Sequence, residues 1–309
     1  MAVTPTRACT ALLIAIVMTG VTTPMDSRAQ AVPWPSLPAA VDAAIARVPG
    51  AEVAVSVVDL ADDRAWDLRG DVVYHAASMM KVPVLIELFR RAERGGISLD
   101  ERVPLMNEFP SLVDGSPYTL KAADDSDDLV YTWVGTPVTW TQLAERMITH
   151  SSNLATNAMI TRLGAEAITA TAHALGAGPR TVVRRGVEDQ KAFDRGINNE
   201  MTTHDLAGLF AALERGKVAG PTGTARMREI LLKQFFNGGI PKGLPAGVRF
   251  AHKTGEIRAH FHDGGIVYPP TGAPYVLVVF TRGIDETTKA EALAADIARV
   301  VHRTVRPAK

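Results

Sequence analysis

Residues 77–96 read ASMMKVPVLIELFRRAERGG. From Met79 to Arg91 the apolar residues recur with the spacing of a helix, and the two glycines that follow end the pattern. The stretch therefore predicts a helix that begins at Ser78. Residues three apart share one face of a helix, so the amine of Lys81 can reach the hydroxyl of Ser78.

A serine whose hydroxyl lies near a lysine amine can act as a nucleophile. A serine hydroxyl attacks poorly at neutral pH unless a neighbouring base accepts its proton. The first N–H groups of a helix have no partner within the helix, so they can stabilise negative charge that develops on an attacked carbonyl. The pattern by itself is common, and Ser78 as an ordinary N-cap residue is the alternative interpretation.

The ends of the chain mix strands and helices, whereas its middle is mostly helical. Periodicity predicts strands over 53–57, 65–68, 248–252, 260–267 and 275–281. It predicts further helices over 37–48, 139–150, 153–164, 166–176 and 288–301, with a Thr139/Gln142 capping box at the start of the second.

These elements indicate an α/β (α+β) fold with two subdomains. The simplest assembly is an antiparallel sheet with flanking helices, built from residues 30–77 and 229–309 at the two chain ends. Residues 78–228 then form an inserted all-helical subdomain. The cleft between the two is the expected substrate site.

The N-terminal residues have the layout of a signal peptide. Arg7 precedes an apolar run over 8–21, and cleavage candidates around Ala29 follow. The run is short for a bilayer span, so we expect removal of residues 1–29 and export to the periplasm or the medium; an uncleaved anchor is the alternative. Cys9, the only cysteine, lies in this segment, so the mature chain is expected to have no disulfide and no cysteine nucleophile.

Charge and composition exclude several classes of partner. Lys+Arg and Asp+Glu number 33 each among 309 residues, and 47% of the residues are hydrophobic, enough for a sizeable core. A balanced charge does not indicate binding to nucleic acid or to an anionic membrane. We expect a monomer that acts on a small molecule or peptide, with no stable membrane anchor and no cofactor.

Two patterns have some of the features of metal sites. The loop-like segment 107–136 contains Asp124-Asp125-Ser126-Asp127-Asp128, but it lacks the glycine and the final glutamate of an EF-hand loop. A solvated acidic loop is the preferred interpretation. His260 and His262 share one face of a predicted strand, but no third zinc ligand is evident. No metal site is therefore predicted.

Two further motifs follow Ser78-Met79-Met80-Lys81 along the chain: Ser151-Ser152-Asn153 and Lys253-Thr254-Gly255. Each is common alone, but the three in this order are specific. In them the chain resembles the class A β-lactamases and penicillin-binding proteins, a superfamily of serine hydrolases. The resemblance covers nearly all of the chain after the signal segment, and it implies a β-lactamase-like fold and an acyl-enzyme on Ser78.

The resemblance also implies catalytic roles for the first two motifs. Lys81 activates Ser78, and both burial and the nearby cation Lys253 favour the neutral amine that this requires. Ser151 passes a proton to the leaving nitrogen. Asn153 binds the amide of the substrate, and it can cap a helix at the same time.

The lysine motif completes the binding site that the resemblance implies. Backbone N–H groups of Ser78 and Glu256 form the oxyanion hole. Lys253 and Thr254 address the carboxylate of the substrate, and Gly255 leaves room for its backbone. Relatives often add a cation from the next strand, for which three residues remain open here: Arg258, His260 and His262.

Ser152 is a mild departure from the family pattern. Class A relatives usually have an aspartate at this place between Ser151 and Asn153. Without it, the loop that carries Ser151 lacks the carboxylate that braces it in the family.

Glu188 occupies the place of the glutamate that activates the deacylating water in class A β-lactamases. Its surroundings depart from that pattern: Ala192 stands for the usual asparagine, and Gly186 and Met201 stand for the usual Arg/Asp pair. A solvated loop glutamate is the alternative to a general base. Candidates for the missing groups are Asn198 or Asn199 for the amide, and Arg184 or Arg185 with Asp194 or Glu200 for the ion pair.

Three functions fit these observations. The first is a class A β-lactamase-like serine hydrolase that opens the β-lactam amide. The second is another esterase or peptidase of the same fold, such as a D-alanyl-D-alanine carboxypeptidase. The third is a penicillin-binding protein that is acylated but does not turn over. Ser78 does not lie in a G-x-S-x-G turn, so the sequence does not indicate an α/β-hydrolase.

Overall fold

A five-stranded antiparallel sheet organises the fold. The computed structural model describes residues 1–2 and 33–307, and its sheet has the strand order β2-β1-β11-β10-β9. Both ends of the chain contribute to it, as predicted. The strands are β1 (Glu52–Asp59), β2 (Ala65–Leu68), β9 (Arg249–Ile257), β10 (His260–Tyr268) and β11 (Tyr275–Arg282).

Strand β9 is longer than its sequence pattern predicts. The pattern ends at residue 252, whereas the strand continues through the Lys253-Thr254-Gly255 motif. Lysine and glycine are poor strand formers, but pairing with β10 places Lys253 opposite Gly264 and extends the ladder. Because β9 is the last strand of the sheet, its outer edge is available to other parts of the molecule.

The two faces of the sheet belong to two hydrophobic clusters. Along β11, Val276, Val278 and Phe280 pack into one cluster, while Leu277 and Val279 pack into the other. Alternation with a period of two follows from strand geometry. The central strand is therefore covered on both faces, which explains its unbroken run of apolar residues.

Helices α1 (Leu37–Ile45) and α10 (Thr287–Val305) pack together over one face of the sheet. Both were predicted from their periodicity, and both are confirmed with shifted ends. A short helix that the sequence analysis did not predict, α9 (Ile240–Gly243), packs on α10.

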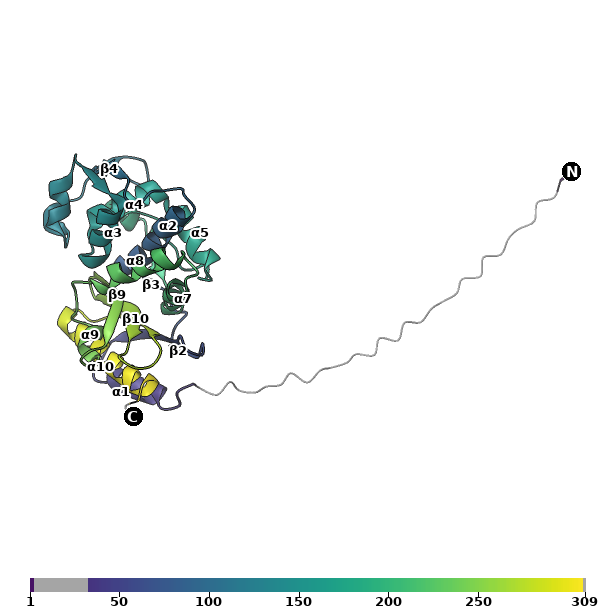
Figure 1. Cartoon of the computed structure of the whole chain (residues 1–309), viewed down its shortest axis with the longest axis vertical. Helices are drawn as coiled ribbons and strands as arrows, with labels where there is room; N and C mark the ends of the chain where they lie inside the picture. The colour runs from purple at the N-terminus through teal and green to yellow at the C-terminus, as the bar shows by residue number, and fades with distance from the viewer. Residues whose placement is uncertain (3–32, 308–309) are drawn as a thin grey trace. The chain divides into compact units, whose positions relative to one another are not determined.

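The other face of the sheet meets α7 (Thr203–Glu214) and α8 (Pro221–Leu232), and α8 was not predicted. Beyond them lie helices from the middle of the chain (Figure 1). These confirm the predicted helical middle, and the Thr139/Gln142 capping box at the start of α3 is present. They are α2 (Lys81–Glu93), α3 (Trp140–Thr149), α4 (Asn153–Leu163) and α5 (Ala165–Ala174).

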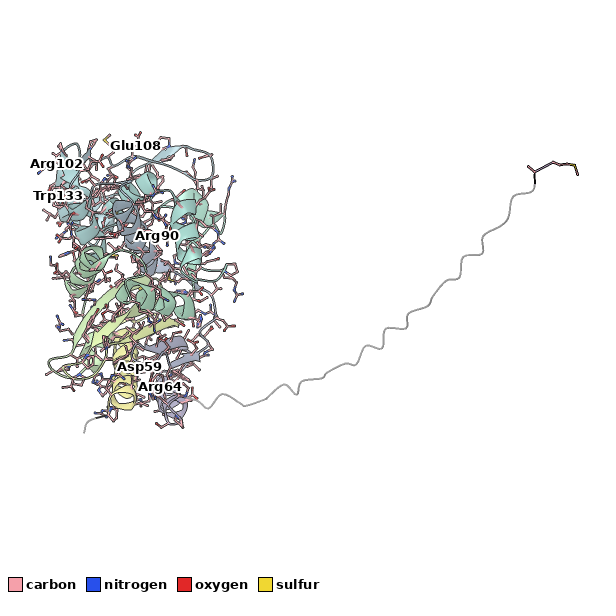
Figure 2. All side chains as sticks on the ribbon, turned by 45° about the vertical axis from the view of Figure 1, so that its right-hand side comes forward. Asp59, Arg64, Arg90, Arg102, Glu108 and Trp133 are labelled. Atoms are coloured by element: carbon pink, nitrogen blue, oxygen red, sulfur yellow. The ribbon has the colours of Figure 1, made fainter. Side chains whose placement is uncertain are left out.

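All the labelled side chains in Figure 2 except Arg90 lie at one of the two ends of this arrangement. Asp59 and Arg64, 3.6 Å apart in an ion pair, lie at the end that carries the sheet (Figure 2). Arg102, Glu108 and Trp133 lie at the opposite, helical end (Figure 2). Arg102 belongs to β4 (Arg102–Pro104), which pairs with β7 (Pro137–Thr139) just before α3.

The segment 107–136 is more ordered than predicted. It contains β5 (Phe109–Pro110), β6 (Pro117–Tyr118) and the 3₁₀ turns η2 (Ala122–Asp124) and η3 (Asp128–Trp133). The prediction of a solvated acidic loop is wrong for two of its carboxylates. Asp127 is buried in an ion pair with Arg146, and Asp125 accepts backbone hydrogen bonds from α4. A count of local charges could not reveal these distant partners.

The predicted signal peptide, with Cys9, lies almost wholly outside the described residues. Within the described part, no helix has the length and apolarity needed to cross a bilayer. The predicted limits of the two subdomains stay a prediction.

Candidate active site

Ser78 lies in a 3₁₀ turn, η1 (Ala77–Met80), that continues directly into α2. The α-helix therefore begins at Lys81 and not at the serine. Ala77 has a φ of +46°, a left-handed conformation that costs a non-glycine residue roughly 1–3 kcal/mol. Met79 and Met80 are buried, so packing holds the turn in this conformation while Ser78 stays partly exposed.

The outer edge of β9 packs against this turn. A Cβ atom on Gly255 would lie 3.2 Å from the backbone N of Ser78 and 3.0 Å from Cγ of Met79. The predicted reason for this glycine, room for the substrate, stays a prediction. Gly255 also lets the edge strand lie directly beside the Ser78 amide, with Glu256 next along the same strand.

The three motifs meet at the side chain of Ser151. Nζ of Lys81 donates to the backbone oxygen of Ser151 at 2.5 Å, to its Oγ at 3.1 Å and to Oδ1 of Asn153 at 2.9 Å. Nζ of Lys253 donates to the same Oγ at 3.1 Å and to the backbone oxygen of Thr254 at 2.6 Å. Both lysines are fully buried, so one hydroxyl bridges two buried amines.

Burial lowers the pKa of Lys81 to about 7, although the carboxylates of Asp125 and Glu188 act to raise it. The pKa of Lys253 also lies well below its usual range, because this amine is buried and near Lys81. At neutral pH a substantial fraction of Lys81 is therefore the neutral amine that can accept a proton.

The loop of Ser151 connects α3 to α4, and Ser151 has a φ of +58°. The prediction that Asn153 caps α4 is wrong. Ser152 is the cap, since its hydroxyl accepts from the backbone N of Ala155 at 3.2 Å. Asn153 is the first helical residue, and its side chain accepts from Lys81 and donates to Oε1 of Glu188 at 3.0 Å.

Glu188 is partly buried, and it has a φ of +63°. Burial raises its pKa, the hydrogen bond from Asn153 lowers it, and the nearby carboxylate of Asp125 raises it again. The amide of Asn153 thus joins Glu188 to Lys81. The structure brings Glu188 to the same site as the three motifs.

The backbone beside Glu188 is held by Asn157, a buried residue of α4. Its Nδ2 donates to the backbone oxygen of Val187 at 2.9 Å, and its Oδ1 accepts from Val187 N at 2.7 Å. A Cβ on Gly186 would lie 2.8 Å from both Asn157 Oδ1 and the hydroxyl of Tyr118. An arginine side chain therefore has no room at position 186.

An ion pair and an amide among the candidates from the sequence lie on either side of Glu188 along the chain. Arg184 and Glu200 form the predicted ion pair, 2.9 Å apart. Asn199 accepts from the backbone N of Arg184 and Arg185 at 2.8 and 3.1 Å, so it braces the loop. Ala192 is buried in α6 (Gln190–Asp194) and offers no polar side chain.

Two cavities of about 270 and 310 Å³ adjoin the nucleophile, and Ser78, Asn153 and Glu256 line both. Glu188 and Phe193 line the first cavity, on the side of the Glu188 loop. The second cavity lies on the side of the lysine motif. Its lining includes Ser151, Thr254, Phe236 and the carboxylates Asp124, Glu256 and Glu291.

None of the three candidates for a carboxylate-binding cation is among the described residues that line these cavities. His262 is buried, its Nε2 contacts the backbone oxygen of His75, and burial lowers its pKa to about 3. It is therefore neutral and cannot act as that cation. Arg258 is exposed and His260 partly exposed. In the described part of the chain, no group of three or more His, Cys, Asp or Glu is arranged to hold a metal.

Sequence reasoning missed two residues that support the site, Asn157 and Asp125. Asn157 had a usable signal, because it lies four residues after Asn153 and therefore on the same face of α4. Asp125 had none, because its partners are 28 and 29 residues away.

Comparison with known proteins gives matches over most of the chain. A model of the Beta-lactamase enzyme family matches residues 36–305. The β-lactamase of Streptomyces albus G is 26% identical over 268 residues, which are 85% of this chain and 83% of that protein.

Solved structures agree with these matches. The structure of PBP-A has 27% identity and a TM-score of 0.75, and the likeness covers 88% of this chain and 97% of that one. A mutant of PBP-A, solved as an acyl-enzyme complex with penicillin G, has 26% identity and a TM-score of 0.75 over 89% and 97% of the two chains.

Proposed function

The chain belongs to the Beta-lactamase enzyme family, and from that premise we propose that it is a serine β-lactamase that opens the lactam amide through an acyl-enzyme on Ser78. The observation that carries the proposal is the pair of buried amines on one hydroxyl. Lys81 and Lys253 both lie 3.1 Å from Oγ of Ser151, and Lys81 follows the nucleophile by three residues.

Acylation follows from this arrangement. The neutral amine of Lys81 takes the proton of Ser78 as Oγ attacks the lactam carbonyl. Backbone N–H groups of Ser78 and Glu256 stabilise the oxyanion, a contribution of roughly 3–4 kcal/mol per donor. Ser151 then passes a proton to the lactam nitrogen, and its hydroxyl is replenished through the lysine amines with which it shares hydrogen bonds.

Deacylation requires a second base. The ester carbonyl formed on Ser78 adjoins the first cavity, which Glu188 also lines. A water there is deprotonated by the Glu188 carboxylate and attacks the ester. Asn153 orients that carboxylate through its hydrogen bond of 3.0 Å.

The two cavities define how a substrate lies across Ser78. The acyl side chain occupies the first cavity, and the part that leaves with the nitrogen occupies the second. Thr254 and the amine of Lys253 meet the substrate carboxylate on that second side. The likeness to a PBP-A mutant that was captured as a penicillin G acyl-enzyme supports a β-lactam substrate.

One observation favours a second candidate, a penicillin-binding protein that is acylated and does not rapidly release the acyl group. The residue four positions after Glu188 is Ala192, which is buried and apolar, so it cannot help to hold a hydrolytic water. The likeness to PBP-A is consistent with this candidate.

Turnover and labelling distinguish the two. Purified mature protein is mixed with a chromogenic cephalosporin and, separately, with a fluorescent penicillin. Turnover with no accumulated label supports the β-lactamase. Stable labelling without turnover supports the penicillin-binding protein, and ester hydrolysis without either signal supports another hydrolase of this fold.

Export completes the proposal. We expect cleavage near residue 29 and a monomeric enzyme in the periplasm or medium. N-terminal sequencing of the protein recovered from that fraction tests the cleavage, and analytical ultracentrifugation tests the monomer.

A further inference from the structure

The stretch Asp125-Ser126-Asp127 contacts the loop that carries Ser151 and the two helices that this loop connects, α3 and α4. Arg146 and Asp127 form a buried ion pair, with Nε and Oδ2 2.6 Å apart. The hydroxyl of Ser126 donates to the backbone oxygen of His150 at 2.9 Å. The acidic segment is therefore joined by hydrogen bonds to both ends of this loop.

Asp125 makes the contact nearest the chemistry. Its two carboxylate oxygens accept from the backbone N of Asn153 at 3.0 and 2.9 Å, and Oδ2 also accepts from Leu154 N at 3.1 Å. Tyr131 in η3 donates its hydroxyl to the same Oδ2 at 3.0 Å, which fixes the carboxylate. A carboxylate on the free N–H groups of a helix start is favourable in both charge and hydrogen bonding.

We propose that Asp125 is the carboxylate that positions the Ser151-Ser152-Asn153 motif. Within the motif itself, this chain has Ser152 at the place where class A relatives usually have an aspartate. The inference rests on the proposed function, since the reaction it serves is acylation of Ser78. Ser152 keeps the cap on Ala155 N. Asp125, from a distant segment, holds the backbone of Asn153 so that its side chain reaches both Lys81 and Glu188.

Asp125 also acts on the charge of the site. Lys81 faces three ionisable side chains from three elements: Asp125, Glu188 and Lys253. The Asp125 carboxylate raises the pKa of Lys81. Its removal therefore lowers the pH at which Lys81 loses its proton, an effect that a purely structural cap would not have.

The test measures acylation by a fluorescent penicillin as a function of pH in three variants. Asp125→Ala is expected to slow acylation by about 10- to 100-fold, because Asn153 and the Ser151 loop lose their support. Asp125→Asn keeps the shape if the alanine variant does not fold, and we expect the acid limb of its acylation profile to move to lower pH. Asp128→Asn, an exposed carboxylate of the same segment, is the matched control and should acylate like the parent.

The decisive experiment introduces the aspartate that class A relatives usually have at position 152. In the Asp125→Ala background, Ser152→Asp supplies a carboxylate at the same helix start and should recover acylation at least tenfold. Hydrogen exchange at the amides of Asn153 and Leu154 measures their hydrogen bonds to Asp125, whether or not penicillin reacts. Both amides should lose protection in Asp125→Ala. Unchanged exchange, or parental acylation with an unmoved acid limb, would overturn the proposal. A parent that fails to acylate while the exchange changes as expected would overturn only the proposed function.

Discussion

The acylation groups and the Glu188 loop lie in one site but are built differently. Ser78 lies in the η1 turn and Lys81 begins α2, while Lys253 comes from a strand of the central sheet, with both lysines fully buried. Glu188 comes from a loop with a left-handed backbone and is only partly buried. Its place depends on side chains from elsewhere, above all Asn157.

This difference separates the two halves of the reaction. Groups carried by packed helices and strands are held by the core, so their geometry resists local change. A loop held by a few hydrogen bonds can be altered with less effect on the rest of the fold. Ser78, Lys81 and Lys253 should therefore keep their positions when neighbouring residues are substituted, whereas Glu188 should lose its position more easily.

The largest effect is expected at the nucleophile. Ser78→Ala should lower β-lactam turnover by about 10⁴-fold or more, because no acyl-enzyme can form. Mass spectrometry after incubation with penicillin should show no adduct. Ser98→Ala, an exposed serine after α2, serves as the control and should keep both turnover and adduct. An adduct on the Ser78→Ala protein would show that another residue is the nucleophile.

Glu188→Gln should split the two halves of the cycle. We expect deacylation to fall by about 10²- to 10⁴-fold while acylation changes little, because the amide cannot accept a proton from water. The acyl-enzyme should then accumulate in a stopped-flow or mass-spectrometric time course. Glu108→Gln, an exposed glutamate at the helical end (Figure 2), should leave both steps unchanged. Normal turnover by Glu188→Gln would remove this residue from the mechanism.

The pH dependence of acylation should report Lys81. The protonated amine cannot accept the serine proton, so the acylation rate rises with pH through the lysine pKa of about 7 and levels off above it. Below that pH the rate should fall about tenfold per pH unit. Single-turnover acylation is the right measurement, because Glu188 titrates in the later step. A flat profile between pH 5 and 8 would contradict Lys81 as the base.

Most of the fold and of the acylation centre could be predicted from the sequence. In α2, α10 and the five strands, the spacing of the apolar residues shows which face is buried. The three motifs can be recognised from their order along the chain. The extension of β9 beyond residue 252 could not be predicted, because pairing with β10 overrides weak local propensity.

The residues that hold the site in place were harder to predict, again because contacts distant in sequence determine their roles. The roles of Asp125 and Gly255 depend on contacts with Asn153 and with the Ser78 turn, which are distant in sequence. Local rules treat an aspartate as a solvated charge, and they cannot show that a glycine lies against a distant turn. Both roles follow from tertiary contacts.

The smallest effects are expected in the support of the loop. Asn157→Leu fills a similar volume but removes the hydrogen bonds of Asn157 to the backbone N and O of Val187, and the O keeps a longer one, of 3.4 Å, from the hydroxyl of Tyr118. An unsatisfied buried group costs about 1–3 kcal/mol, so the free energy of unfolding should fall by that order in a urea titration. Deacylation should slow about tenfold, because Glu188 directly follows Val187, while acylation should stay within about twofold.

Glu200→Gln is the matched control for that loop. It weakens the Arg184–Glu200 ion pair, whose side chains are 40% and 35% exposed, and an exposed pair of this kind contributes only about 0.2–1 kcal/mol. Deacylation should therefore change less than in Asn157→Leu. Equal losses of acylation and deacylation in Asn157→Leu would mean that the loop and the acylation centre are held together as one unit, contrary to the difference in their construction.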